Sequence, residues 1–238
     1  GDKFYRYGIM MSEVEQIMAC IRAFNDEDNY KMIGELPLYI EKSTSFDIRA
    51  LAQVRDFSAL LEVLAKTPYA DLIRPFSVTN MEDFDYTACE SVLRKYFYDQ
   101  VMKIVDQEFS GKVKKEIREI FLTQIELDNI TRIYRSKRYF NATPAQIKKV
   151  INPVYLRIPK RELEDMIDHC NAEEFMERLA RSAYHNYLDS SNFAYIEYHA
   201  QSINYNLNKR HMMFSTNPDI VLIAYLVLSE TEIQNVVD

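Results

Sequence analysis

Residues 126–135, with the sequence E-L-D-N-I-T-R-I-Y-R, form a stretch that recurs elsewhere in the chain. A second copy begins at Glu13 (E-V-E-Q-I-M-A-C-I-R), and a shorter one begins at Glu232 (E-I-Q-N-V-V). Each copy has an aliphatic residue after the Glu, Asn or Gln at the fourth position, and Ile or Val at the fifth; the two long copies end in Arg22 and Arg135. A motif that recurs at wide spacing predicts a chain built from related modules.

The Glu of each copy lies within the apolar stripe of a predicted helix. At about 100° per residue, Ile130 and Ile133 fall close to Glu126 around the helix axis. Glu13 and Glu232 have the same apolar surroundings. A buried carboxylate must find a cation, accept hydrogen bonds or take up a proton. We expect each Glu to contact an Arg, a Lys or a helix N-terminus on a neighbouring helix. A buried polar contact that fixes how the helices pack is favoured over a catalytic role.

The composition favours an all-α fold. Only 4 Gly and 7 Pro occur in 238 residues, which disfavours a sheet protein with many tight turns. A net charge of −7 argues against broad binding of nucleic acid or of anionic membranes, which usually requires a basic face. The longest apolar run, residues 220–228, is about half as long as a membrane-spanning helix, so no direct membrane span is predicted. The three widely spaced cysteines are typical of reduced thiols in a cytoplasmic protein.

Start signals divide the chain into a repeated series of helices. Capping patterns begin at Ser12, Asp56, Thr143 and Asn171, and each predicts the N-terminus of a helix.

The repeats predict three helical modules: residues 1–78 (partial), 79–188 with a long helical hairpin, and 189–238 (partial). Tyr184 follows Tyr69 at nearly the spacing that separates the first two copies of the motif, which indicates that a whole module is duplicated. Because the third copy of the motif stops as soon as it begins, and the first lacks a preceding hairpin, we expect the chain to be truncated at both ends.

The repeated motif, together with N-P-D-I-V-L-I-A-Y-L-V-L-S-E-T-E-I-Q-N-V at residues 217–236, resembles the C-type subunit of bacterial and archaeal V-type ATPases and its eukaryotic counterpart, the d-type subunit. This resemblance implies three similar modules around a pseudo-threefold axis that form a funnel, here incomplete at both ends. It implies a cytoplasmic position at the membrane periphery, with the other central-stalk subunits and the membrane proteolipid ring as partners. The expected role is a non-catalytic coupling subunit in ion transport, with no cofactor.

The resemblance supplies no binding residues, so the candidate site residues come from the repeated motif itself. Arg135 lies about 180° around the helix from Glu126 and is the better candidate for an outward contact. The groups predicted to hold modules together or to contact partners are Glu13, Gln16, Arg22, Glu126, Asn129, Arg132, Arg135, Glu232 and Asn235.

Two other classes of function stay open from the sequence. The same repeats would suit a helical-repeat adaptor protein of another pathway. An enzyme would rest only on the carboxylates in apolar stripes, and no phosphate-binding glycine motif or metal-ligand spacing is present. His169 and Cys170 are adjacent, so on a helix they point about 100° apart and make a poor catalytic pair.

Overall fold

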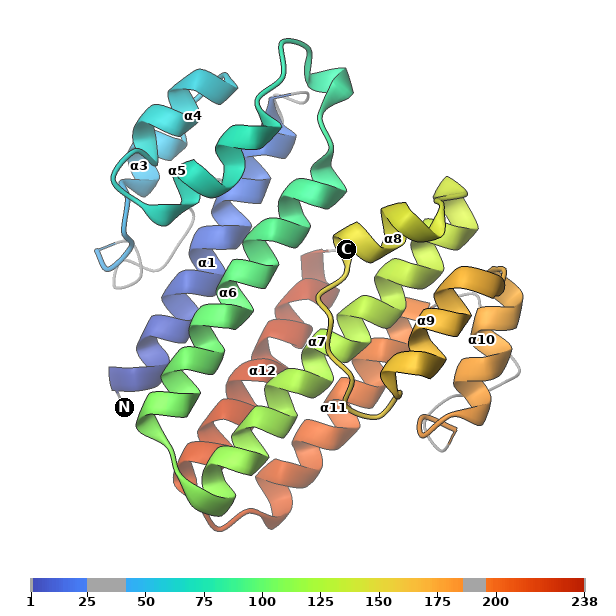
Figure 1. The fold of residues 1–238 in the computed structure, drawn as a ribbon. Coiled ribbons are helices and arrows are strands. Elements are labelled where there is room, and N and C mark those ends of the chain that lie inside the picture. Colours follow the sequence, from blue (N-terminus) through green and yellow to red (C-terminus); the bar gives the residue numbers. More distant parts are fainter. Residues whose placement is uncertain (1, 25–41, 186–195, 238) are drawn as a thin grey trace. The chain divides into compact units, whose positions relative to one another are not determined.

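The computed structural model describes residues 2–24, 42–185 and 196–237, and in these ranges helices are the only regular secondary structure (Figure 1). The side chains of residues 2–4, 197–198 and 230–237 lie outside the description. The predicted all-α fold is confirmed. The pseudo-threefold relation and the funnel stay predictions.

The chain forms two compact units, Gly1–Val101 and Met102–Asp238. Their boundary lies within the long helix α6 (Tyr86–Glu108), whose last residues belong to the second unit. The division into three modules stays a prediction.

Two long antiparallel helices support the first unit. In α1 (Asp2–Ala23), Tyr7 near the N-terminus packs on Phe97 of α6, with the ring centroids 5.2 Å apart. Near the other end of α1, the carbonyl of Ile21 accepts a hydrogen bond from the hydroxyl of Tyr86, 3.3 Å away. Short helices connect α1 to α6: α3 (Ile48–Leu51), α4 (Phe57–Val63), α5 (Pro68–Ile73), η2 (Arg74–Phe76) and η3 (Met81–Asp83).

The second unit has the same order of elements, with a long helix, short helices and a long helix. The first is α7 (Gly111–Phe140); the others are α8 (Pro144–Val150), α9 (Lys160–His169), α10 (Ala172–Arg181), α11 (Ile196–Phe214) and α12 (Pro218–Val237). Figure 1 shows α7, α11 and α12 side by side, with α11 antiparallel to α7. The apolar stripe of α7 forms one wall of a core whose other side chains come from α8, α9, α10 and α11 and from the segments between them, which contribute Ile158 and Tyr184.

The predicted helix starts are confirmed at three positions and wrong at one. Thr143 and Asn171 form capping boxes with Gln146 and Glu174, and the side chain of Asp56 caps α4. Ser12 does not start a helix, because α1 already begins at Asp2. A capping pattern only offers a possible start, and the helix extends before Ser12, where Tyr7, Ile9 and Met11 continue the buried side of α1.

Among the helices of the described ranges, none combines the length and the hydropathy required for crossing a lipid bilayer.

Candidate functional site

The carboxylate of Glu126 lies in the core of the second unit and is only 1% exposed. Its Oε1 atom accepts hydrogen bonds from three consecutive backbone N–H groups, those of Leu156 (2.8 Å), Arg157 (3.0 Å) and Ile158 (3.1 Å). Its Oε2 atom accepts from the hydroxyl of Tyr184 (2.6 Å) and from the Arg157 N–H (3.1 Å). Donors on both oxygens offset the cost of removing the charge from water.

Asn129 holds the same segment one helical turn further along α7. Its side-chain amide donates to the backbone carbonyl of Asn152, and its side-chain oxygen accepts from the Asn152 N–H at 2.9 Å. We call residues 152–158 the strap, because α7 grips the backbone of this non-helical segment at both ends. The strap joins α8 to the start of α9, so Glu126 and Asn129 fix the short helices against α7.

Arg157 closes the strap onto α7 with its side chain. One guanidinium nitrogen donates to the hydroxyl of buried Thr123 at 2.6 Å, and another donates to Glu119 at 3.2 Å. The guanidinium carbon lies 5.8 Å from the ring centroid of Tyr184, within the range of a cation–π contact. Thr123, Glu126 and Asn129 follow at intervals of three residues, so one face of α7 carries the whole set of contacts.

Glu13 has a matching environment in the first unit. It is 3% exposed, and its two oxygens accept hydrogen bonds from the Ser45 backbone N–H and from the hydroxyl of Tyr69, the latter at 2.7 Å. Ser45 lies just before α3, as Ile158 lies just before α9. In each unit a buried Glu on the first long helix therefore meets a loop amide and the hydroxyl of a later Tyr.

The donors differ from those predicted. For Glu13 and Glu126 we expected an Arg, a Lys or a helix N-terminus, but the donors are loop amides and a Tyr hydroxyl. Arg157, which supplies one amide, directs its guanidinium to Thr123 and Glu119 instead. The prediction failed because the strap turns consecutive N–H groups towards the carboxylate, and these satisfy it without a cation.

The structure brings together only some of the predicted residues. Gln16 is buried one turn after Glu13, at the position that Asn129 occupies after Glu126. Arg22 and Arg135 are exposed and Arg132 is half-buried, so none of them is enclosed with the carboxylates. Glu232 and Asn235 fall within α12, but their side chains lie outside the described part of the chain.

Tyr69 and Tyr184 are functional candidates that the sequence reasoning missed. Burial, and then the adjacent negative charge of Glu13 or Glu126, raises the pKa of each phenol. The recurrence of the two tyrosines was visible in the sequence but was read only as a sign of duplication. Lys137 was also missed; its ammonium group donates to the carbonyls of Ile167 (2.7 Å) and Cys170 (2.6 Å) at the C-terminal end of α9.

The raised pKa of Tyr184 predicts a loss of stability in alkali. In the unfolded chain a Tyr ionises near pH 10, whereas the folded protein keeps this phenol protonated to higher pH. Its contribution to stability is therefore complete below about pH 10 and falls as the pH rises further, by about 1.4 kcal/mol per pH unit. Urea unfolding above pH 10 should show a shallower decline for Tyr184→Phe than for the wild type. Tyr139→Phe, at a Tyr that is 62% exposed, is the control and should keep the wild-type dependence of the unfolding free energy on pH. An unchanged dependence for Tyr184→Phe would contradict a raised pKa for Tyr184.

The cysteines and histidines form no recognisable reaction centre in the described part of the chain. Burial raises the thiol pKa of Cys20 and of Cys89 to about 12, so both are inert at neutral pH. No cluster of three or more His, Cys, Asp or Glu side chains that could hold a metal ion occurs among the described residues. At Glu126 itself, the described contacts are hydrogen bonds that join α7 to the strap and to Tyr184.

Two comparisons bear on the whole chain. A family model described as "ATP synthase (C/AC39) subunit" matches residues 1–237. No curated protein gives a significant match.

Proposed function

Because the chain belongs to the family of ATP synthase (C/AC39) subunits, we propose that it is the coupling subunit of the central stalk in a rotary V-type ATPase. Members of this family are structural and not catalytic subunits of the ATP synthase. In the proposed role the protein joins the tip of the stalk to the membrane proteolipid ring and turns with the rotor. It would work at the cytoplasmic periphery of the membrane and contribute to ion transport without an active site of its own.

The observation that carries this proposal is the family match over residues 1–237, which favours it over an adaptor of another pathway. The structure adds a physical argument. A protein that transmits torque must resist deformation, and in the second unit the strap is hydrogen-bonded to α7 at Glu126 and at Asn129. Directional hydrogen bonds in a buried site fix one relative position of two segments more strictly than apolar contacts do.

Within this role we propose two groups of residues. Glu13, Gln16, Glu126 and Asn129 hold short helices or loops against a long helix, and Glu232 with Asn235 would repeat this in a third module. The exposed Arg22 and Arg135, together with the half-buried Arg132, are the candidates for contacts with partner subunits.

Co-purification with the other subunits tests the proposal. The full-length protein should be retained by the isolated central-stalk subunits and, separately, by the proteolipid ring. Arg135→Glu should weaken retention by at least one of them about tenfold, because reversing one charge in a contact typically costs more than 1.4 kcal/mol. Lys149→Glu, at an exposed Lys on the short helix α8, is the matched control. Retention of the wild type by neither partner would refute the coupling role.

A further inference from the structure

Two large apolar side chains project from the C-terminal end of α11. Met213 is 66% exposed and Phe214 is 75% exposed, the highest value among the large hydrophobic side chains of the described chain. Residues 215–217 then turn the chain into α12. Single exposed apolar residues are common. Two consecutive ones at the end of a helix bundle, however, form a small apolar surface that is exposed to solvent in the second unit.

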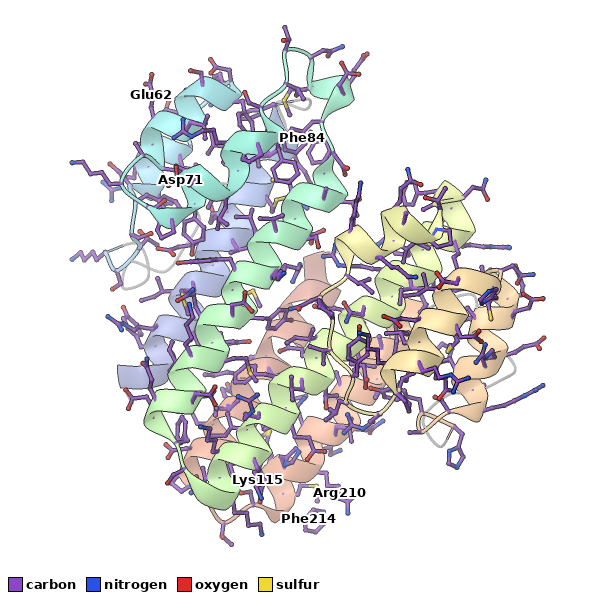
Figure 2. All side chains as sticks on the ribbon, viewed as in Figure 1. Glu62, Asp71, Phe84, Lys115, Arg210 and Phe214 are labelled. Atoms are coloured by element: carbon purple, nitrogen blue, oxygen red, sulfur yellow. The ribbon has the colours of Figure 1, made fainter. Side chains whose placement is uncertain are left out.

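Unpaired cations lie at the same end of the second unit. Figure 2 shows Lys115, from the start of α7, and Arg210, one turn before Phe214, at the same end of the second unit as Phe214. Both are exposed, and neither lies within ion-pair distance of a carboxylate among the described residues. Other cations at the start of α7 are neutralised: Lys114 and Arg118 both pair with Asp106, at 3.0 Å and 2.7 Å. The charges of Lys115 and Arg210 therefore remain available to a ligand.

The basic tip, which we define as Lys115, Arg210, Met213 and Phe214, stands out against an acidic chain. The protein carries a net charge of −7, so an anionic surface repels most of it and attracts this end. The attraction orients the molecule before contact and weakens as salt is added. Apolar side chains between cations are the combination that binds the boundary between lipid headgroups and acyl chains.

We propose that the basic tip binds the surface of an anionic lipid bilayer. Lys115 and Arg210 contact lipid phosphates, while Met213 and Phe214 enter the boundary between headgroups and acyl chains. A bilayer fits better than a protein partner, because a specific protein interface buries about 800 Å² on each side with complementary shape. Two side chains projecting from a helix end supply far less, whereas a fluid bilayer needs no matching shape. This inference goes beyond the proposed coupling role and does not depend on it.

Vesicle flotation tests the proposal with the full chain alone. Wild-type protein should float with phosphatidylcholine vesicles that contain phosphatidylglycerol and not with pure phosphatidylcholine vesicles, and high salt should release it. Met213→Ser/Phe214→Ser and Lys115→Glu/Arg210→Glu should each weaken binding about tenfold or more, because the first variant removes the apolar side chains that enter the bilayer and the second reverses both attractive charges.

The opposite end of α7 offers matched controls. Tyr139 and Phe140 are also consecutive, exposed by 62% and 67%, so Tyr139→Ser/Phe140→Ser removes a similar apolar pair elsewhere. Lys149→Glu/Arg161→Glu reverses two exposed cations away from the tip. Both controls should bind anionic vesicles as the wild type does, and circular dichroism should show that all four variants keep their helices.

Each outcome decides between the proposals. Equal flotation with both kinds of vesicle, or tip variants that bind like the wild type, would overturn the lipid inference. The same holds if vesicles are not bound but tip variants lose retention by the stalk or by the ring, which would assign the tip to a protein partner. Lipid binding that needs the tip, in a protein retained by neither partner, would refute the coupling role and leave this inference standing.

Discussion

Replacing Glu126 with Gln is expected to lower the free energy of unfolding of the second unit by about 3–5 kcal/mol, because about two hydrogen bonds to a charged group, each worth roughly 1.5–3 kcal/mol, are lost. Three backbone N–H groups and the Tyr184 hydroxyl point at the carboxylate. A Gln keeps one acceptor oxygen and places an NH₂ donor where the other oxygen stood, so buried donors face a donor and lose their partner. Urea unfolding measures the global loss. Amide hydrogen exchange at residues 156–158 reports directly on the strap.

Glu119→Gln is the matched control on the same helix. This Glu is half exposed and, among the described residues, accepts from the Arg157 side chain alone, so the same chemical change should cost less than about 1 kcal/mol. Its effect on exchange at the amides of Leu156, Arg157 and Ile158 should be small. A loss below about 1 kcal/mol for Glu126→Gln, or unchanged protection of these amides, would mean that the carboxylate does not hold the strap.

The burial of Glu126 could be predicted because helical periodicity is a local property. Its neighbours Ile130 and Ile133 mark one face of α7, and a residue at the same angle must share their environment. The start of α8 was predictable for a similar reason, because Thr143 and Gln146 satisfy each other's backbone within one turn. Local signals of this kind do not depend on where the rest of the chain lies.

The donors to Glu126 could not be predicted, because they depend on tertiary register. The strap has no helical period, and nothing in its sequence states that three consecutive N–H groups turn towards α7. Arg157 shows the difficulty: it contacts Glu126 through its backbone N–H, while its guanidinium donates to Thr123 and Glu119. Pairing Glu126 with an oppositely charged side chain would therefore not have predicted this contact, which a backbone amide makes.

The two tyrosines show that residues recurring in a repeat can indicate a hydrogen bond. Tyr69 and Tyr184 recur with the buried Glu residues, and a hydroxyl that recurs with a buried acceptor is a candidate partner for it. The two Glu–Tyr pairs are separated by 56 and 58 positions along the chain. The recurrence of the same donor and acceptor at nearly the same separation in both repeats would have predicted both hydrogen bonds. The capping pattern at Ser12 misled because buried apolar residues before it continue the same helix.

The buried Glu residues also bear on how a protein in the coupling role could carry load. Apolar contacts in a helical core can slide with little change in buried area, whereas a carboxylate with donors on both oxygens has one favourable position. A buried Glu with such donors in each unit would fix the short helices at an equivalent position along the long helix of that unit. In the coupling role, a variant that weakens the hydrogen bonds of one buried Glu should lower the resistance of the protein to deformation before it prevents assembly.

Glu13→Gln is expected to lower the free energy of unfolding of the first unit by about 2–4 kcal/mol. The reason is the same as for Glu126, with the Ser45 amide and the Tyr69 hydroxyl left facing a side-chain amide. Tyr69→Phe should cost less, about 1.5–3 kcal/mol, because it removes one charged hydrogen bond and leaves the carboxylate its backbone donor. Glu62→Gln on α4, at an exposed Glu, is the control and should cost less than about 0.5 kcal/mol.

Combining Glu13→Gln with other changes shows whether each tie is local. With Tyr69→Phe the two losses should not add, because both remove the same hydrogen bond. With Glu126→Gln they should add within about 0.5 kcal/mol, because the two carboxylates share no hydrogen-bond partner. Urea unfolding of the single and double variants gives both coupling energies. Strong coupling between the two Glu residues, or simple addition of Glu13→Gln and Tyr69→Phe, would refute the view that each unit carries its own independent tie.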